Sequence, residues 1–435
     1  MRFYIETLGC KVNQSESRSV AALLTRRGHT EARRGEPCDV IIVNTCAVTG
    51  EASRRSRQTA RRLKRLFPDA VLAICGCAGD TEPRQLRELG AAIVFGSGDR
   101  AKFADTLEAY INGDQRDEID ITADSLSPHG SPADDIKTAF ELLPVGDTVR
   151  ARASLKIQDG CDSFCAYCVI PYARGRSRSI PIPEAAERAR ELSQRGFREI
   201  IVTGIEICSY GHDLGSGENL SALLRAISKA APDSRIRLGS LEPSRVDAEL
   251  IQTLTDLPRV CDHFHISLQS GSAATLRRMR RRYTPQELLD LLARLRGAFP
   301  DAGVTADVIA GFPGETDAEL RETAAFLEQC AFSDLHVFPY SVRPGTAAAA
   351  MENQIPSAEK KSRAAILRDI GARTRAAFIA TQYGKTAEVL FEREENGFST
   401  GHSGNYLEIR EKITDVRGML LPVVMRDGNV LLRHK

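Results

Sequence analysis

The chain contains two successive stretches in which short apolar runs alternate with helix-like segments. In the first hundred residues, the predicted strands cover 2–8, 40–45, 71–74 and 92–95, and predicted helices at 15–27, 51–67 and 83–89 separate them. Alternation of this kind implies a parallel sheet whose crossover connections are helical. The first hundred residues are therefore predicted to form an open parallel α/β domain.

The second alternation begins near residue 152 and is longer than the first. Its six candidate strands lie at 153–158, 199–203, 235–241, 263–269, 304–310 and 335–340, with helical segments between them. Six β/α units are fewer than the eight of a closed barrel. The predicted architecture is therefore a partial (β/α)6 barrel.

The rest of the chain consists of a tail and a linker. After a helix predicted at 358–383, β-like runs at 386–391, 406–410, 419–425 and 430–433 suggest a small β-barrel. Such barrels often bind oligonucleotides, although this one could simply pack on the main body. The acidic stretch 114–144 is typical of a linker. The predicted domains are residues 1–112, 147–375 and 376–435, with a linker at 113–146.

Composition limits the compartment and the chemistry. The 435 residues carry a net charge of only +1, and the apolar runs are too short to span a membrane. The N-terminal sequence lacks the pattern of a signal peptide, so we expect a cytoplasmic protein without membrane association. Eleven cysteines in such a chain favour metal binding or catalysis over disulfides, because the cytosol keeps thiols reduced.

Three cysteines follow the first strand of the second alternation within eight residues, namely Cys161, Cys165 and Cys168. Three thiolates on one loop can hold one face of a 4Fe–4S cluster, which takes four ligands. One iron then stays open and can bind a substrate directly. A structural zinc site is the alternative, but no histidine or fourth cysteine follows at zinc-finger spacing.

A second group of cysteines is distributed. Cys10, Cys46 and Cys77 follow three successive predicted strands, and ligands of open parallel sheets bind beyond the carboxyl ends of the strands. A second three-ligand cluster is predicted there; the alternative is small buried cysteines that pack as apolar groups. Cys75 is also close by, but it would lie within the strand, so the Gly-Cys pairing selects Cys77.

These motifs resemble two parts of a known family. The pattern C-x3-C-x2-C, with an aromatic residue before the last cysteine, resembles the signature of the radical S-adenosylmethionine (SAM) superfamily. The contexts TLGCKVNQ at 7–14, VNTCAVT at 43–49 and CGCA at 75–78 resemble the N-terminal domain of the methylthiotransferases. Segments 240–243, 267–272 and 307–316 resemble core segments of that family, and the β tail resembles its RNA-binding TRAM domain.

The resemblance implies two 4Fe–4S clusters and SAM as cofactors. In the superfamily, the open iron of the loop cluster takes the amino and carboxylate groups of SAM, and an electron delivered through the cluster cleaves SAM to a 5′-deoxyadenosyl radical. The resemblance places Tyr167 near the adenine of SAM, and Thr203 and Gly204 near its amino group. The usual Gly-Gly-Glu is here Thr-Gly-Ile-Glu. No protein residue is assigned a catalytic role.

The family adds a methylthio group to an unactivated C–H bond of one of three substrates: isopentenyladenosine in tRNA, threonylcarbamoyladenosine in tRNA, or a ribosomal-protein aspartate. The sequence GCKVNQ at 9–14 resembles the threonylcarbamoyladenosine branch, which modifies C2 of adenosine 37 in the anticodon loop. The implied partners are tRNA and an electron donor such as flavodoxin or ferredoxin.

Two basic runs, at 54–65 and 277–282, modestly favour an RNA substrate over a protein, because phosphate contacts need Lys and Arg. Solvated helix faces are the simpler interpretation of such runs. A non-catalytic iron–sulfur RNA-binding protein is the alternative of another class. It would explain the β tail but not a three-cysteine site with an open iron followed by six β/α units.

Overall fold

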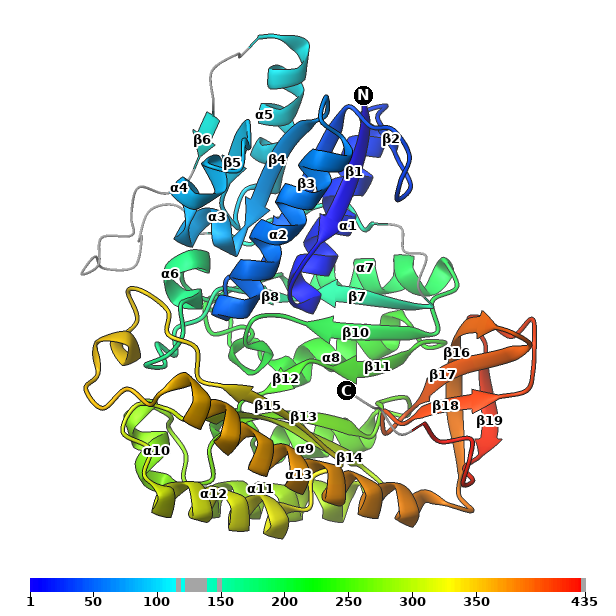
Figure 1. Cartoon of the computed structure of the whole chain (residues 1–435). Coiled ribbons are helices and arrows are strands. Elements are labelled where there is room, and N and C mark those ends of the chain that lie inside the picture. The colour runs from blue at the N-terminus through cyan, green and yellow to red at the C-terminus, as the bar shows by residue number, and fades with distance from the viewer. Residues whose placement is uncertain (115–118, 122–138, 147–150, 432–435) are drawn as a thin grey trace. The chain divides into compact units, whose positions relative to one another are not determined.

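The computed structural model describes residues 1–114, 119–121, 139–146 and 151–431 (Figure 1). The chain divides into two compact units, which are described separately. The first unit comprises Met1–Thr148, Gln158–Ile180 and Ser341–Ala349, and the second comprises Val149–Ile157, Pro181–Tyr340 and Ala350–Lys435. The predicted linker at 113–146 lies mostly outside the described residues, and the predicted domain limits stay a prediction.

The first unit is built on a six-stranded sheet in which all neighbouring strands are parallel. The strand order is β2-β1-β3-β4-β5-β6, with β1 (Arg2–Thr7), β2 (Thr30–Glu31), β3 (Val40–Thr45), β4 (Val71–Gly76), β5 (Ile93–Phe95) and β6 (Ile119–Ile121). The connecting helices are α1 (Lys11–Arg26), α2 (Gly50–Leu66), α3 (Cys77–Thr81), α4 (Pro83–Arg87) and α5 (Arg100–Asn112). The predicted open parallel α/β domain is confirmed, although the apolar pattern does not predict β2, β6, α3 or α5.

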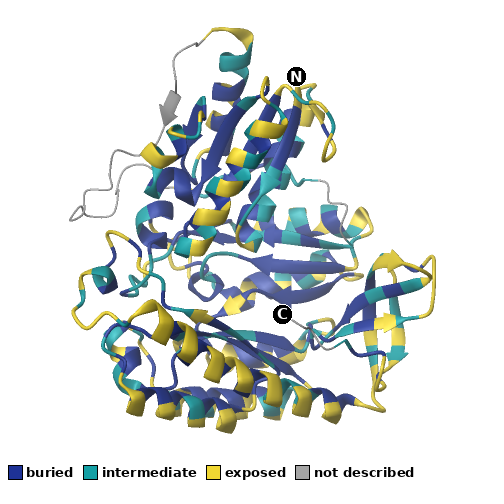
Figure 2. Cartoon of the chain, in the orientation of Figure 1, coloured by how far each residue is buried: buried dark blue, intermediate teal, exposed yellow. Residues whose placement is uncertain are grey.

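The centre of this sheet is buried on both faces. Every residue of β3 is buried, as expected for a parallel strand with helices on both sides (Figure 2). Leu24 of α1 and Phe103 of α5 join Phe3 and Ile42 in one hydrophobic cluster. Because the faces are covered, the carboxyl ends of the strands are the places where this sheet can present functional side chains.

The second unit contains two parallel sheets that follow one another along the chain. The first has the order β11-β10-β7 and the second β12-β13-β14-β15, and Gly239 alone separates β11 from β12. The strands are β7 (Arg152–Lys156), β10 (Glu199–Thr203), β11 (Arg235–Leu238), β12 (Ser240–Leu241), β13 (His263–Gln269), β14 (Gly303–Ala310) and β15 (Asp334–Pro339). All six predicted strands are present and parallel, so the predicted partial barrel is confirmed.

Helices cover one face of these sheets. They are α7 (Ile182–Gln194), α8 (Leu220–Ala230), α9 (Ala248–Asp256), α10 (Ala273–Arg278), α11 (Pro285–Ala298), α12 (Asp317–Cys330) and α13 (Ser357–Gln382). Thr284 and Thr316 begin α11 and α12 with capping boxes, in which the threonine and a glutamate satisfy each other's backbone N–H groups. Across the described residues, no helix is long and apolar enough to cross a membrane.

The tail folds as a small antiparallel β domain, as predicted. Its sheet has the order β18-β17-β16-β19, with β16 (Thr386–Glu395), β17 (Phe398–Ser403), β18 (Glu408–Glu411) and β19 (Leu420–Val424). The apolar pattern does not predict β17, because FSTGHS is mostly polar. Of the run predicted at 430–433, Val430 forms a bridge with Ile409, and residues 432–433 lie outside the described part of the chain.

Two buried arginines join this β domain to the barrel strands of the same unit. Arg235 donates hydrogen bonds to the carbonyls of Glu388 (3.0 Å) and His402 (2.8 Å), and Arg237 donates to the carbonyl of Ser403 (3.0 Å). Glu199, which is fully buried on β10, forms ion pairs with both guanidinium groups. Its carboxylate oxygens lie 2.7 Å from Nε of Arg235 and 2.8 Å from Nε of Arg237. The β domain is therefore attached by buried guanidinium groups, which its removal would leave with Glu199 but without their carbonyl partners.

Candidate functional site

Three cysteines of the first unit lie at the carboxyl ends of three neighbouring strands. Cys10 lies between β1 and α1, Cys46 follows β3, and Cys77 follows β4 as the first residue of α3. Gly9 has a left-handed φ of 108°, and a β-carbon there would stand 2.8 Å from Cβ of Cys46. Because only glycine tolerates that approach, the loops of Cys10 and Cys46 pack against each other.

The thiols of this group differ in depth but interact with one another. Cys10 is exposed, whereas Cys46 and Cys77 are buried. Burial raises the pKa of the Cys77 thiol to about 12. The positive charge of Arg174 lowers this pKa, and the nearby thiols of Cys46 and Cys10 raise it further. A thiol in this setting becomes a thiolate only when a metal or another cation compensates its charge.

Cys75 lies in the hydrophobic core, apart from this group, because it pairs with Asn44 within the sheet and clusters with Phe95 and Phe103. We therefore expect Cys75→Ser to keep the full iron content after anaerobic reconstitution, and Cys77→Ser to lose the iron of one cluster. Iron and sulfide analysis of the two purified variants measures this difference. Full iron in Cys77→Ser together with a loss in Cys75→Ser would reverse the assignment.

The second group of cysteines occupies a loop of the same unit, between β8 (Gln158–Asp159) and α6 (Ile170–Arg174). Strand β8 pairs with β9 (Arg178–Ser179) and closes the loop. The N–H of Cys168 donates to the carbonyl of Cys165 at 3.0 Å, and the N–H of Ser163 donates to Sγ of Cys161 at 3.4 Å. An N–H that points at a sulfur favours its thiolate form.

The number and type of donors in the two groups bear on the choice between a cluster and a single ion. Within the described ranges, the one set of His, Cys, Asp or Glu ligand atoms that all lie within 4.8 Å of one another contains no cysteine. A zinc ion draws its ligands around one point, whereas each thiolate of a 4Fe–4S cluster takes a different iron. Three thiolates in each group, one for each of three irons, are the donor set of a 4Fe–4S cluster with one open iron.

Arg174, the last residue of α6, connects the two cysteine groups. Its side chain is fully buried, and its Nε donates to Sγ of Cys77 at 3.3 Å. Its terminal nitrogens donate to Glu16 at 2.8 and 3.2 Å, to Asp159 at 2.9 Å and to Asn13 at 2.9 Å. Because the guanidinium presents its donors in a fixed fork, these partners hold the cysteine loop and Cys77 in one arrangement.

Asn13 extends this network to the first cysteine. Its side-chain nitrogen donates to the carbonyls of Leu8 (3.0 Å) and Thr45 (2.8 Å), and its oxygen accepts from the Cys10 thiol at 3.4 Å. Asn13, Glu16 and Arg174 are missed by reasoning from cysteine spacing. The available signal is the three-residue spacing of Asn13 and Glu16 on α1, which begins directly after Cys10.

The residues predicted to contact SAM are distributed over both units. Tyr167 lies in the cysteine loop of the first unit, half-buried, whereas Thr203 ends β10 of the second unit and Gly204 follows it. Thr203 is buried, and its carbonyl accepts a hydrogen bond from the N–H of Ile157 at 2.8 Å. Their joint assignment to a SAM site stays a prediction.

Glu206, in the Thr-Gly-Ile-Glu sequence, is held by its own surroundings. Its carboxylate accepts from the N–H of Cys208 at 3.0 Å and pairs with Arg245 at 3.3 Å. The carboxylate thus caps the short 3-10 helix Ile207–Ser209. Cys208 is buried there, and burial raises the pKa of its thiol well above the ordinary value, which supports a packing role for this cysteine.

Two family models match the chain. Residues 155–327 match the Radical SAM superfamily, and residues 2–96 match a family described as uncharacterized protein family UPF0004. The first match contains the cysteine loop and most of the barrel strands. The second contains the sheet that carries Cys10, Cys46 and Cys77.

Curated relatives align over nearly the whole chain. The threonylcarbamoyladenosine tRNA methylthiotransferase MtaB of Bacillus subtilis is 36% identical over 96% of this chain and 92% of its own length. The protein of the same name from Thermotoga maritima is 36% identical, with coverages of 89% and 86%. The tRNA-2-methylthio-N(6)-dimethylallyladenosine synthase of Thermotoga petrophila is 33% identical, with coverages of 96% and 91%.

A solved structure supports the fold. TsrM from Kitasatospora setae, a radical S-adenosylmethionine methyltransferase with cobalamin and a [4Fe-4S] cluster bound, aligns with a TM-score of 0.59 over 80% of this chain and 74% of that chain. At 15% identity this likeness concerns the fold alone.

A parallel partial barrel with a three-cysteine loop after its first strand defines the class of radical SAM enzymes, and the matched superfamily agrees. Identity above 30% over nearly the full length of the relatives is more specific. The chain belongs to the family of radical SAM tRNA methylthiotransferases.

Proposed function

We propose that this enzyme adds a methylthio group to C2 of N6-threonylcarbamoyladenosine at position 37 of tRNA. The observation that carries the proposal is the presence of two three-cysteine groups in one compact unit of a chain whose full-length relatives are named for this reaction. Radical chemistry suits the reaction because the target carbon has no acidic proton that a general base could remove.

Each cysteine group would hold one 4Fe–4S cluster and leave one iron without a protein ligand. Cys161, Cys165 and Cys168 would hold the radical cluster, and that cluster would supply the electron for the reductive cleavage of SAM. Cys10, Cys46 and Cys77 would hold the second. One sulfur of each set accepts a hydrogen bond from the protein, Cys77 from Arg174 and Cys161 from the N–H of Ser163.

The proposed macromolecular partners are the anticodon loop of tRNA and an electron donor such as flavodoxin or ferredoxin, in the cytoplasm. The basic runs differ in how many of their charges are available to phosphate. On α2, Arg54 and Arg55 are exposed beside Glu51, whereas Arg57 pairs with Glu82 at 2.5 Å. Arg57 is therefore a poorer candidate for a phosphate contact than its neighbours.

The basic run at 277–282 likewise contains both arginines that are paired within the fold and arginines that are exposed. Arg278 donates two hydrogen bonds to Glu319 (2.9 and 2.7 Å), and Arg281 donates to Glu242 and to the carbonyl of Ser267. These two arginines hold the fold of the second unit. The remaining three of the run are exposed, namely Arg277, Arg280 and Arg282.

Replacing Arg277, Arg280 and Arg282 together with Gln should weaken tRNA binding and reduce the slope of log K against log salt by about three, if each contacts one phosphate. Fluorescence anisotropy of labelled tRNA over a range of salt measures the slope. The matched control replaces three exposed arginines that form surface ion pairs, Arg190, Arg225 and Arg373. Equal loss of slope in both variants would mean that the run has no special role in RNA binding.

The substrate is tested with anaerobically reconstituted enzyme, SAM and a reductant. The enzyme should methylthiolate tRNA that carries the threonylcarbamoyl group and leave tRNA without that group unmodified, as measured by mass spectrometry of digested nucleosides. A relative named for dimethylallyladenosine is 33% identical, so isopentenyladenosine tRNA is the second substrate to test. Product from that tRNA alone would move the enzyme to the sister branch, and product on a ribosomal protein would exclude RNA as the substrate.

A further inference from the structure

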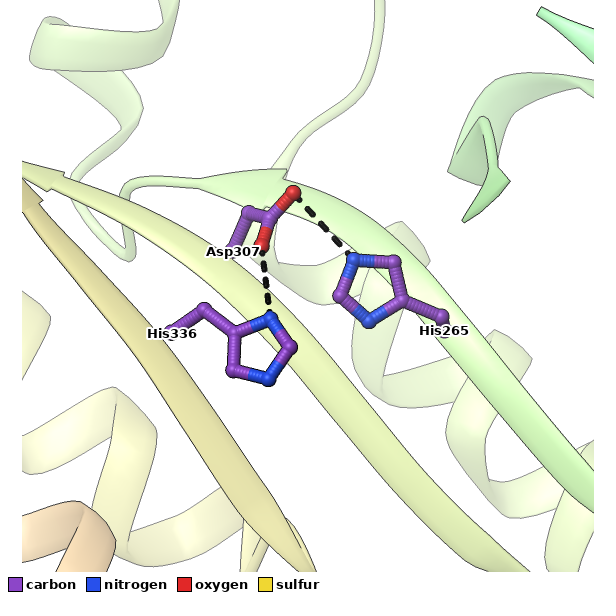
Figure 3. A group of neighbouring side chains, drawn as sticks. All are labelled: His265, Asp307 and His336. Carbon is purple, nitrogen blue, oxygen red and sulfur yellow. Dashed lines mark ion pairs between the residues drawn. The ribbon is translucent and has the colours of Figure 1, made fainter. Parts of the chain in front are cut away.

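Two histidines and an aspartate meet on a barrel sheet of the second unit. They are His265 of β13, Asp307 of β14 and His336 of β15, on three neighbouring strands (Figure 3). Asp307 stands directly opposite His336 in the β14–β15 register. Nε2 of His265 is 3.2 Å from Oδ2 of Asp307, and Nδ1 of His336 is 3.3 Å from Oδ1.

The three side chains lie on the face of the sheet opposite the helices. Phe264 and Ile266 of β13 are fully buried, and the ring of Phe264 lies 5.0 Å from that of Phe299, the residue that follows α11. Because strand side chains alternate between faces, His265 points away from these helices. The side chains of His265, Asp307 and His336 are 14%, 29% and 35% exposed, so a small ion can reach them.

We propose that His265, Asp307 and His336 form a binding site for a zinc ion. Their ligand atoms all lie within 4.8 Å of one another. A tetrahedral zinc ion with bonds of about 2.0–2.1 Å needs neighbouring ligand atoms roughly 3.3 Å apart. Each histidine nitrogen already lies at about that distance from one oxygen of Asp307, His265 from Oδ2 (3.2 Å) and His336 from Oδ1 (3.3 Å). Two imidazoles and one carboxylate favour Zn²⁺ over Mg²⁺ and Ca²⁺, which prefer oxygen ligands throughout.

Thr305 contacts the ring nitrogen of His265 that does not face Asp307. Its hydroxyl lies 2.8 Å from Nδ1 of His265 and 3.2 Å from Nε2 of His263. When the hydroxyl accepts from Nδ1 of His265 and donates to His263, Nε2 of His265 presents its lone pair toward Asp307 and the ion. An outer hydrogen bond of this kind commonly fixes the tautomer of a metal-binding histidine.

Three protein ligands leave one coordination position of a tetrahedral ion open, as in catalytic rather than structural zinc sites. That position would take water or a small oxygen or nitrogen ligand. The site contains none of the cysteines proposed to hold clusters, and it does not depend on the identity of the tRNA substrate.

The test uses the full chain with its clusters reconstituted anaerobically. After equilibration with Zn²⁺ and desalting, elemental analysis should find about one zinc per chain, and His265→Ala and His336→Ala should each lose it. The matched control, His212→Ala, removes an exposed histidine of the same unit and should keep the zinc. Equal iron content and circular dichroism in all variants show that the fold and the clusters are intact.

A second variant leaves all three ligands in place. Thr305→Val should weaken zinc binding by about 10- to 100-fold, measured by competition with a chromogenic zinc chelator. X-ray absorption of the bound zinc should show nitrogen and oxygen neighbours. A parent chain that retains no zinc, histidine variants that retain it fully, or sulfur neighbours around the zinc would each overturn the proposed site.

Discussion

Replacing Cys161, Cys165 and Cys168 together with alanine should abolish the cleavage of SAM to 5′-deoxyadenosine. The three thiols occupy one loop, which the β8–β9 pair closes, so the variant removes the proposed ligands without changing the paired residues. Iron should fall from about eight to about four per chain, because each 4Fe–4S cluster accounts for four. Chromatography with mass detection measures 5′-deoxyadenosine in the reduced enzyme.

The matched control for this result is the other cysteine group. Alanine at Cys10, Cys46 and Cys77 should remove the same amount of iron but leave SAM cleavage largely intact, while no methylthio product forms. Formation of 5′-deoxyadenosine by the Cys161, Cys165 and Cys168 variant would contradict the assignment of the radical cluster.

Arg174→Gln should destabilise the first unit by about 3–5 kcal/mol, the usual cost of removing one partner from a buried ion pair. The side chain is fully buried between Glu16 and Asp159, and its loss leaves each carboxylate with less compensating charge. Arg100 still donates to Glu16 at 3.0 Å and Arg178 to Asp159 at 2.8 Å, so we expect the lower end of this range.

Hydrogen exchange of the β3 and β4 amides in the full chain, compared between the parent and Arg174→Gln, measures this cost. Arg176→Gln is the matched control, because Arg176 lies two residues further along the chain and is exposed, with an ion pair to Asp162 at 3.2 Å and a cation–π contact with Phe164. An exposed pair contributes about 1 kcal/mol or less. Equal exchange rates in the two variants would show that the buried network around Arg174 does not stabilise this unit.

Reasoning from sequence succeeds where function and fold follow from local pattern. The apolar runs at 40–45 and 199–203 coincide with β3 and β10, because buried parallel strands are nearly continuous in apolar residues. The positions of Cys10, Cys46 and Cys77 after three such strands then place all three at one edge of the sheet. The cysteine loop can be predicted because its three cysteines lie within eight consecutive residues.

Ion pairs between residues far apart in the chain cannot be predicted from local sequence patterns. Arg174 stands in a stretch rich in arginine whose local sequence does not mark it as buried, yet it is fully buried among the carboxylates of Glu16 and Asp159. Arg278 and Arg281 likewise read as part of a uniform basic run, but both are engaged with glutamates. His265 and His336 are brought together only by strand register.

The missed strand β17 has a different cause. Asn396 and Gly397 both have positive φ, at 52° and 75°, which suits the turn of a tight hairpin. The sequence Asn-Gly predicts such a turn. The strand that follows is mostly polar, so a search for alternating apolar residues does not find the hairpin.

The central claim is tested most directly by nucleoside mass spectrometry of tRNA from a strain that lacks this gene. The account predicts that N6-threonylcarbamoyladenosine accumulates without its 2-methylthio derivative. The intact gene should restore that derivative, and the gene carrying Cys77→Ser should not. A deletion strain that keeps normal levels of the methylthio derivative, or one that instead loses methylthio-isopentenyladenosine, would contradict the proposed substrate.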